Sequence, residues 1–242
     1  MGREIATIAL QDFDSIFTLG AALEVPGHEG SGKDYGIVLG RPHTLGVSVS
    51  TDAKAAINHG DVLIEFTAPE VTVEHVQLAQ ELRKPMVIGT TGLSESQRSV
   101  LQTASKTIPI VFSPNMSLAV NVLFELAQLA AQRLGLGYDV EVVENHHRHK
   151  KDAPSGTAKR LMEVIAAARK QSPDTVPVHA IRAGDIVGDH TVILAGPAER
   201  LELTHRAQSR EVFARGALKA AQFVVTQKPG LYDMSHVLGS SR

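Results

Sequence analysis

The sequence predicts an α/β protein that combines a parallel sheet in its first half with a mixed or antiparallel sheet in its second half. In the first half, short apolar runs alternate with segments of helical periodicity, which is typical of βαβ units. After residue 178, strand candidates follow one another with short connections, which favour antiparallel pairing. A length of 242 residues allows one large domain or two smaller ones, and a hydrophobic share of 43% is typical of a soluble protein.

The first half is predicted to alternate between helices and strands. Apolar runs predict strands at residues 16–23, 62–66, 85–88 and 108–112. Helical patterns lie before and between them, at residues 3–10, 53–58 and 71–82, and from residue 94 to about residue 105. The start of the last helix is well marked, because Ser94 and Gln97 form a capping box.

The pattern changes beyond Asn115. A long apolar helix is predicted at residues 118–134, followed by a strand at 138–144 and a helix at 155–170. Three strands are then predicted at residues 179–183, 190–195 and 201–207, before a last helix at 212–226. Polar residues interrupt the apolar segment 118–136, so it is predicted to be a buried or interface helix and not a bilayer span.

Composition excludes several classes of function. A net charge of −2 and an aromatic content of 4% give no reason to expect a nucleic-acid or membrane partner. The chain contains no cysteine, so disulfides, thiolate nucleophiles and cysteine-ligated metals are excluded. The first residues lack a basic-then-apolar leader, and we therefore expect a cytoplasmic protein.

The segment from residue 144 to residue 157 has the sequence ENHHRHKKDAPSGT and is dense in chemically active side chains. It runs into a helix start predicted at residues 154–157, and a helix amino terminus binds carboxylates and phosphates through its N–H groups. Imidazole has an ordinary pKa near ~6.5, so a histidine can donate a proton near neutral pH. The segment predicts a site that binds an acidic small molecule and protonates it.

The same segment resembles the catalytic segment of the 4-hydroxy-tetrahydrodipicolinate reductase family. The family pattern E-x-H-H-x-x-K-x-D-x-P-S-G-T-A is present without a gap from residue 144 to residue 158. Other segments resemble the family's further motifs in the same order: IEFTAPE at 64–70, VIGTTG at 87–92, NMS at 115–117, RAGDIVGDH at 182–190 and GLYDM at 230–234. The resemblance extends over most of the chain.

The resemblance implies an architecture and an activity. Residues 1–116 and 212–242 would form a Rossmann-like dinucleotide-binding domain, and residues 117–211 would form an α+β domain that binds substrate and builds a homotetramer. The implied reaction is the NADH- or NADPH-dependent reduction of 4-hydroxy-2,3,4,5-tetrahydrodipicolinate to tetrahydrodipicolinate, in lysine and diaminopimelate biosynthesis. The substrate is a small dicarboxylate.

The resemblance also assigns roles within the histidine-rich segment. His146 would be the general acid, Lys150 would donate or orient a proton, and His147 would bind substrate. Gly156 and Thr157 would receive a substrate carboxylate through their N–H groups and the Thr157 hydroxyl. The simpler alternatives are a surface histidine in a polar loop and an ordinary helix start.

The cofactor residues implied by the resemblance lie in the first domain. Glu24 would accept hydrogen bonds from the adenosine ribose, and the next residue, Val25, is not a base that could hold a 2′-phosphate, so we expect NADH more than NADPH. An ordinary strand-end glutamate and a plain βα turn are the alternatives here. Two loops that follow predicted strands would line the nicotinamide region, and they contain Gly89, Thr90, Thr91, Ser113, Pro114, Asn115 and Met116.

The chain departs from the family pattern at two places. The family opens with a strand and a glycine-rich loop that ends in Met-Gly-Arg, and this sequence begins with those three residues. We expect the first strand and most phosphate-binding glycines to lie upstream of the given sequence. The alternative is a non-catalytic dicarboxylate-binding or scaffold relative that cannot hold a dinucleotide. The second departure is the link at residues 171–180, which is shorter than the family usually has and would affect substrate access.

Two other patterns suggest ligand sites that we do not expect to form. His146 and His149 have a spacing found in metal sites, but the neighbouring lysines and arginine would repel a cation, so no metal is expected. Residues 27–34, GHEGSGKD, nearly match a phosphate-binding loop. Asp34 replaces the required serine or threonine, and we expect a flexible surface loop there.

Overall fold

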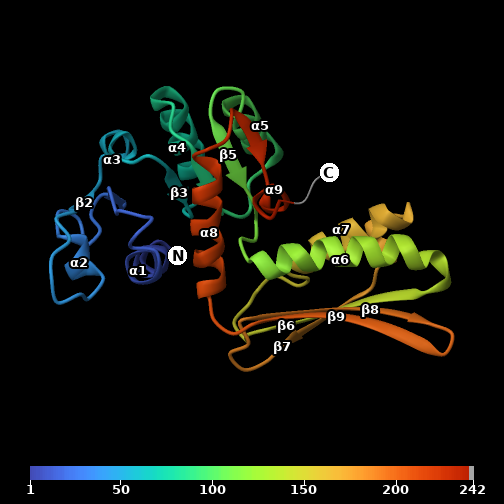
Figure 1. Cartoon of the computed structure of the whole chain (residues 1–242). Coiled ribbons are helices and arrows are strands. Elements are labelled where there is room, and N and C mark those ends of the chain that lie inside the picture. Colours follow the sequence, from blue (N-terminus) through green and yellow to red (C-terminus); the bar gives the residue numbers. More distant parts are fainter. Residues whose placement is uncertain (240–242) are drawn as a thin grey trace. The chain divides into compact units, whose positions relative to one another are not determined.

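The protein is described by a computed structural model in which residues 1–239 are placed. Its contacts divide the chain into two compact units, which can be followed by colour in Figure 1. Unit 1 comprises Met1–Met116 together with the chain from Phe213 onward, and unit 2 comprises Ser117–Val212. The two ends of the sequence therefore share one unit.

Unit 1 contains a four-stranded parallel sheet. Its strands are β3 (Leu63–Glu65), β4 (Met86–Ile88), β5 (Pro109–Phe112) and β10 (Gly230–Tyr232), and their order is β10-β5-β4-β3. A separate parallel pair is formed by β1 (Ala22–Leu23) and β2 (Val49–Ser50). β3 is consequently an edge of the larger sheet among the described residues.

The helices of unit 1 connect these strands and supply most of its core. They are α1 (Gly2–Asp12), α2 (Tyr35–Val38), α3 (Ala53–His59), α4 (Pro69–Leu82), α5 (Glu95–Ala104), α8 (Glu211–Val224) and α9 (Met234–Val237). The predicted capping box is present at the start of α5, where the Ser94 and Gln97 side chains each bond the other residue's backbone N–H. Val76, Ala79, Leu101 and Ala104 pack against the buried strands β4 and β5.

One prediction for the early part of unit 1 is wrong. The strand expected at residues 16–23 is reduced to Ala22–Leu23, because residues 16 and 17 fold back in a turn onto Phe13 and the side chain of Ile16 is 56% exposed. Residues 27–34 form a surface loop of turns, as expected, and the carboxylate of Asp34 at its end accepts hydrogen bonds from the N–H groups of Gly36, Leu45 and Gly46. The bond from Leu45, followed by those from the other amides, lowers the pKa of Asp34.

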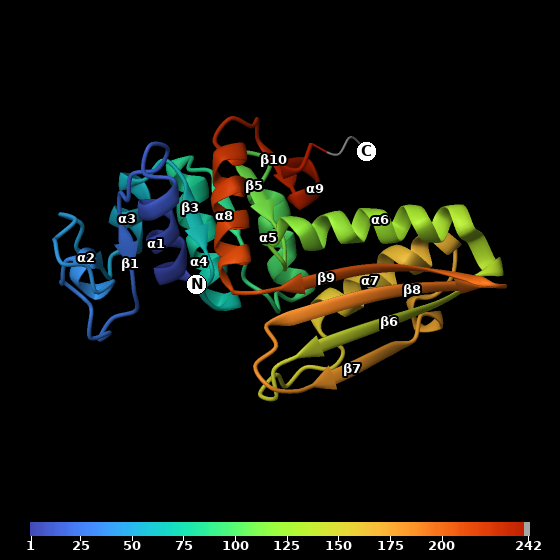
Figure 2. The ribbon, with the colours of Figure 1, turned by 60° about the horizontal axis from the view of Figure 1, so that its bottom comes forward.

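Unit 2 is a mixed four-stranded sheet covered by helices. The strands are β6 (Asp139–His146), β7 (Val178–Arg182), β8 (Gly188–Gly196) and β9 (Glu199–Ala207), in the order β7-β6-β8-β9. β6 and β7 are parallel, whereas β8 is antiparallel to both β6 and β9. The long helices α6 (Leu118–Leu134) and α7 (Gly156–Arg169) lie side by side on one face of this sheet (Figures 1 and 2). Short 3-10 turns occur at η1 (Gly135–Gly137) and η2 (Pro173–Thr175).

Along the buried face of the sheet in unit 2, the side chains are apolar over most of its length and polar at one end. Successive side chains of a strand point to opposite faces, so Val140, Val142, Glu144 and His146 of β6 share the face that is buried. The corresponding face of β8 carries Gly188, His190, Val192 and Leu194. The valines and the leucine pack against α6 and α7, whereas the acidic residue and the histidines gather at one end. That end contains the candidate site.

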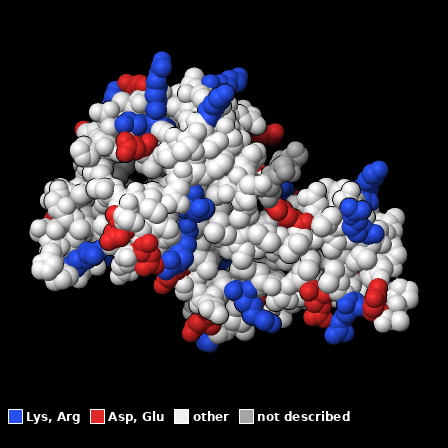
Figure 3. Space-filling view, in the orientation of Figure 1, with Lys and Arg blue, Asp and Glu red and all other residues white. Residues whose placement is uncertain are grey.

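The surface shows no segregation of charge on the face drawn in Figure 3, where acidic and basic side chains are interspersed. Within residues 1–239, none of the helices has both the length and the apolar character needed to span a membrane.

Candidate active site

His146 lies at the carboxyl end of β6 and is only 7% exposed. The sequence predicted a strand that stopped at Glu144 and placed His146 in a loop, and this boundary is wrong. The strand continues because Asn145 pairs with Asp189 of β8 and with Ile181 of β7, and His146 pairs with Arg182 of β7. The alternative of a surface histidine is excluded by this burial.

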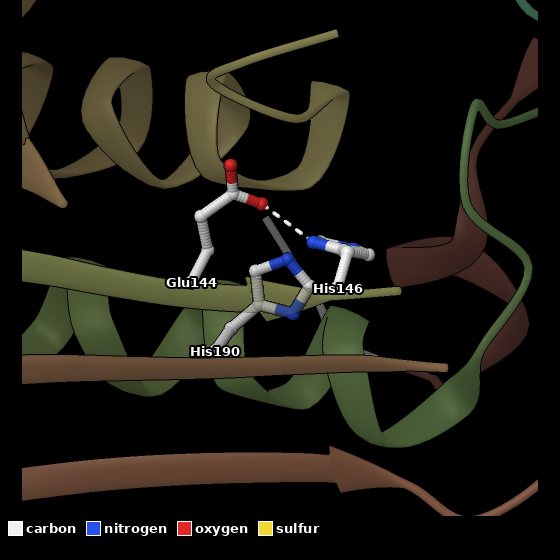
Figure 4. A group of neighbouring side chains, drawn as sticks. All are labelled: Glu144, His146 and His190. Atoms are coloured by element: carbon white, nitrogen blue, oxygen red, sulfur yellow. Dashed lines mark ion pairs between the residues drawn. The ribbon is translucent and has the colours of Figure 1, made fainter. Parts of the chain in front are cut away.

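Glu144 is fully buried; its Oε1 accepts hydrogen bonds, and its Oε2 makes an ion pair with His146 (Figure 4). Oε2 lies 2.7 Å from Nδ1 of His146. Oε1 accepts hydrogen bonds from the backbone N–H of Ser155, at 3.0 Å, and from the guanidinium of Arg182, at 2.9 Å. Burial by itself would raise the pKa of Glu144, but the bonds from His146, Arg182 and Ser155 outweigh it and hold that pKa well below its usual range. The carboxylate is therefore a fixed anion.

His190 packs beside the same pair. Its ring meets that of His146 edge-on, with 5.2 Å between the centroids, and Figure 4 shows both rings directed toward the Glu144 carboxylate. Nε2 of His190 lies 3.3 Å from the hydroxyl of Ser155. Burial, and then the nearby His146, lower the pKa of His190 to about 3. His190 is therefore a neutral imidazole at physiological pH.

The side chains of Glu144, His146 and His190 also have the composition of a metal site. Among residues 1–239 they bring one potential ligand atom each to within 4.8 Å of one another. The carboxylate is already bound to Arg182 and to the Ser155 amide, and a guanidinium at 2.9 Å opposes a second cation. The His146 and His149 pair considered in the sequence is not the pair that the fold brings together in this group.

Lys150 and His147 lie in the turn that follows β6. The ammonium of Lys150 is 2.8 Å from a carboxylate oxygen of Asp152, and its side chain is 22% exposed. The hydrogen bond from Lys150 lowers the pKa of Asp152, so this partner remains ionised. His147 is half-buried, and its ring centroid is 6.3 Å from that of His149.

Gly156 and Thr157 occupy the first two positions of α7. Ser155 caps this helix, since its hydroxyl accepts the N–H of Ala158 at 3.1 Å. The backbone N–H of the same serine is bonded to Glu144, so the helix start and the buried carboxylate are joined directly. Gly156 is exposed, and a methyl group at its position would meet no atom within 4 Å. The space beside this amide is open to a ligand.

The cofactor residues predicted from the resemblance all belong to unit 1. The loops at 89–91 and 113–116 follow the adjacent parallel strands β4 and β5, at the carboxyl edge where open α/β sheets bind ligands. Thr90 is buried, and its hydroxyl lies 2.8 Å from that of Thr72, whereas Thr91 is exposed. Glu24 is exposed and directly follows β1.

The second loop is held mainly through its backbone. The hydroxyl of Ser113 donates to the carbonyl of Asn115 at 2.8 Å, and the N–H of Ser113 donates to the carbonyl of Ile88. Pro114 is exposed, whereas Met116 is 1% exposed. The carbonyl of Met116 lies so close to Gly216 of α8 that any side chain at position 216 would overlap it.

Sequence reasoning assigned no role to Glu144, Arg182 or His190. The alternation Val-x-Val-x-Glu-x-His from residue 140 to residue 146 could have placed Glu144 on the same face as His146, had the strand been extended by two residues. Arg182 and His190 are the first and last residues of the segment RAGDIVGDH that resembles a family motif, but their contacts with Glu144 and Ser155 cannot be read from it, because each residue lies on another strand.

Two family models match the chain. The model described as Dihydrodipicolinate reductase, N-terminus matches residues 1–116, and the model described as Dihydrodipicolinate reductase, C-terminus matches residues 119–238. The chain belongs to the dihydrodipicolinate reductase family. The resemblance seen in the sequence is thereby confirmed.

Similar proteins include curated reductases of nearly the same length. The chain is 46% identical to the 4-hydroxy-tetrahydrodipicolinate reductase of Nitrosomonas europaea, over 99% of this chain and 94% of that protein. It is 45% identical to the protein of the same name from Ralstonia pickettii, over 92% of this chain and 90% of that protein. An oxidoreductase is therefore confirmed, and a non-catalytic relative is not favoured.

Solved structures confirm the fold class. A dipicolinate-bound dihydrodipicolinate reductase from Paenisporosarcina sp. TG-14 has a TM-score of 0.77 at 23% identity, over 96% of this chain and 92% of that chain. An amine dehydrogenase from Mycobacterium smegmatis has a TM-score of 0.64 at 13% identity, over 96% of this chain and 91% of that chain. Such likenesses show a common architecture, with a Rossmann-like parallel sheet and a second, mixed sheet.

Proposed function

We propose that this chain reduces 4-hydroxy-2,3,4,5-tetrahydrodipicolinate to tetrahydrodipicolinate in lysine and diaminopimelate biosynthesis. The observation that carries the proposal is the buried pair of Glu144 and His146 joined to the amino end of α7 through Ser155. It combines a proton source with an anion-binding helix start. The names of the family and of the relatives at 45% and 46% identity agree with it.

The substrate is a small dicarboxylate, and unit 2 offers suitable donors for one. Gly156 and Thr157, at the first positions of α7, would receive one carboxylate through their N–H groups and the Thr157 hydroxyl. His147 would bind the substrate from the turn after β6. The neighbour of similar fold that is named as dipicolinate-bound supports a diacid of this size.

The net reaction adds one hydride and one proton to the substrate and releases water. The nicotinamide cofactor supplies the hydride when it is bound. The hydroxyl on carbon 4 leaves as water before or with hydride transfer. Carbon 4 then gains the hydride, and a proton from His146 neutralises the negative charge that the ring carries. Lys150, oriented by Asp152, supports the charge of the anionic substrate and donates or orients a proton.

The residues of unit 1 fit a pyridine nucleotide. The loops containing Gly89, Thr90 and Thr91 and containing Ser113 to Met116 end neighbouring strands of a parallel sheet, which suits the nicotinamide end. The exposed carboxylate of Glu24 suits the ribose hydroxyls, and Val25 offers no positive charge for a 2′-phosphate. We infer a preference for NADH over NADPH, which the ratio of kcat/KM for the two cofactors measures.

We also infer a homotetramer in the cytoplasm. Unit 2 supports assembly because apolar side chains remain exposed on α6 and β9, including Val122, Leu126, Leu129 and Leu201. Sedimentation equilibrium measures the mass of the assembly directly, and a monomeric mass at assay concentrations would contradict this inference.

Replacing His146 with glutamine tests the proposed function. His146→Gln should lower kcat by ~10²-fold or more, because the general acid is lost while hydride transfer remains possible. His179→Gln is the matched control. His179 lies on β7 of the same sheet, also has a glutamate partner, Glu141, at 2.7 Å, and is exposed. It should retain activity within about twofold, as is usual for a surface change. Unchanged kinetics in His146→Gln would remove the assignment.

A further inference from the structure

The imidazole of His146 contacts, through Nδ1, the carboxylate of Glu144, whose orientation is fixed by other partners. Oε1 of Glu144 is engaged by the Ser155 amide and by Arg182, so Oε2 remains on the side of His146. These partners come from the start of α7 and from β7, which are separate elements. Because an ionised carboxylate offers only hydrogen-bond acceptors, the 2.7 Å contact with Oε2 favours the proton on Nδ1 of His146.

The other ring nitrogen faces a residue without a side chain. A Cβ atom at Gly188 would lie 3.1 Å from Nε2 and 3.3 Å from Cδ2 of His146. Gly188 is at the start of β8, on the buried face that also carries His190. Because Gly188 has no side chain, there is space beside Nε2 of His146. If a methyl group were added at residue 188, the ring of His146 could not easily move away from it, because Nδ1 is paired with Glu144 on the other side.

We propose that Glu144 is a positioning residue that fixes His146 as the Nδ1–H tautomer, so that the substrate proton leaves from Nε2, and that Gly188 keeps the approach to Nε2 open. In the step, the Nε2–H bond breaks, the proton passes to the substrate, and the ring becomes neutral with Nδ1–H still on Glu144. This inference rests on the proposed function for the identity of the proton acceptor.

The neighbouring charges suit this arrangement. Arg182 balances the Glu144 carboxylate from the side away from His146, at 2.9 Å. His190 stays neutral at pH 7 because burial lowers its pKa, so it adds no second positive charge beside an imidazolium of His146. The carboxylate can therefore stabilise the charged ring before the proton is transferred.

The first test replaces the carboxylate with its neutral isostere. Glu144→Gln should lower kcat by ~10²-fold or more while KM changes less than about threefold, since an orienting group acts on the proton transfer. Glu144→Asp, which keeps the charge, should recover part of that loss. Glu141→Gln is the matched control on the same strand, because Glu141 pairs with the exposed His179 at 2.7 Å. It should stay within about twofold of the parent.

The second test reads the tautomer without any turnover. In ¹⁵N-labelled protein, with His146 assigned from the spectrum of His146→Gln, the neutral ring should show protonated Nδ1 and unprotonated Nε2. In Glu144→Gln this preference should be lost. Protonated Nε2 and bare Nδ1 in the parent would overturn the inference, and so would an unchanged kcat in a folded Glu144→Gln variant.

Gly188→Ala tests the open side and does not disturb the carboxylate. A methyl group 3.1 Å from Nε2 should lower kcat by about tenfold, because small misplacements of a reacting group are costly. The tautomer of His146 should remain that of the parent, which separates this effect from that of Glu144. Full activity in Gly188→Ala would contradict the role given to Gly188.

If the parent itself lacked reductase activity, the proposed function would fail, while the tautomer measurement would still decide the role of Glu144.

Discussion

In the loop that follows β4, three adjacent residues have three different surroundings. A side chain at Gly89 would overlap the ring of Phe66, so this glycine is required by packing within unit 1. The hydroxyl of Thr90 is buried on Thr72, whereas Thr91 is exposed. A resemblance to a cofactor loop assigns all three to the same ligand, but only Thr91 has a side chain turned to solvent. Thr90 should contribute to cofactor binding through its backbone.

Paired substitutions separate these contributions. Thr90→Val should destabilise unit 1 by about 1–3 kcal/mol, because the buried Thr72 hydroxyl loses its partner. Thr91→Val should change stability by less than about 0.5 kcal/mol and raise the KM for the nicotinamide cofactor by about three- to tenfold. Urea unfolding and steady-state kinetics measure the two effects.

The double variant Thr72→Val with Thr90→Val is the internal control. Replacing both partners of a buried hydrogen bond with apolar groups of the same shape is nearly neutral. The pair should therefore be more stable than Thr90→Val alone. A double variant less stable than either single variant would show that the hydroxyls contact something other than each other.

Among the elements, β6 carries the proposed catalytic pair because of its alternation and its length. Val140 and Val142 anchor the strand in the apolar core, and the same face then presents Glu144 and His146. The strand pairs with β7 on one side and with β8 on the other, which holds both functional side chains on rigid backbone. A strand that ended at residue 144 would leave His146 on a loop, with less control of its direction.

Helix α8 has a role that its own sequence does not disclose. Gly216 is buried in this helix against the carbonyl of Met116, the last residue of the second proposed cofactor loop. Gly216→Ala should destabilise unit 1 by about 3 kcal/mol, since backbone atoms cannot easily move aside. The better helix propensity of alanine, worth ~1 kcal/mol, does not compensate. Thermal or urea unfolding measures this loss, and cofactor affinity should fall with it.

Gly2→Ala provides the comparison for this change. Gly2 is also in a helix, α1, but a methyl group there would meet no atom within 4 Å. This variant should be as stable as the parent or slightly more stable. Equal effects of the two substitutions would mean that helix propensity, and not the contact with Met116, governs Gly216.

For the molecule as a whole, the buried histidines of unit 2 link stability to pH. The pKa of His190 is lowered to about 3 by burial and by His146, and burial also lowers the pKa of His205. Below pH ~6.5 the unfolded chain therefore binds more protons on these residues than the folded chain does. The free energy of unfolding therefore decreases as pH falls through this range. Glu144, whose pKa is depressed, stays ionised there and loses its contribution only at more acid pH.

The expected loss of stability follows from the one proton that His190 binds in the unfolded chain but not in the folded chain. Between pH 7 and pH 5.5, His190 should account for a loss of about 1 kcal/mol in the free energy of unfolding. His190→Gln should remove that part of the slope, whatever its effect on absolute stability. Hydrogen exchange of β6 and β8 amides, corrected for the intrinsic pH dependence of exchange, reports on unit 2 alone. An identical slope in the variant and the parent would show that His190 is not the group responsible.

The sequence by itself determined the family, the types of nearly all long elements and the segment that carries the histidines. These properties depend on short-range patterns: apolar periodicity, the capping box at Ser94 and an uninterrupted motif. Short elements such as α2, β2 and β10 were missed because a few residues carry little periodicity.

Only the tertiary structure decided which groups surround His146. Arg182 is separated from Glu144 by 38 residues, and His190 from Ser155 by 35. Such contacts depend on the register in which β6 pairs with β7 and β8, and register is a property of the assembled sheet. A local motif can therefore indicate a candidate proton donor. The orientation and tautomer of that histidine, and the open space beside its ring, depend on strands that meet only in the folded chain.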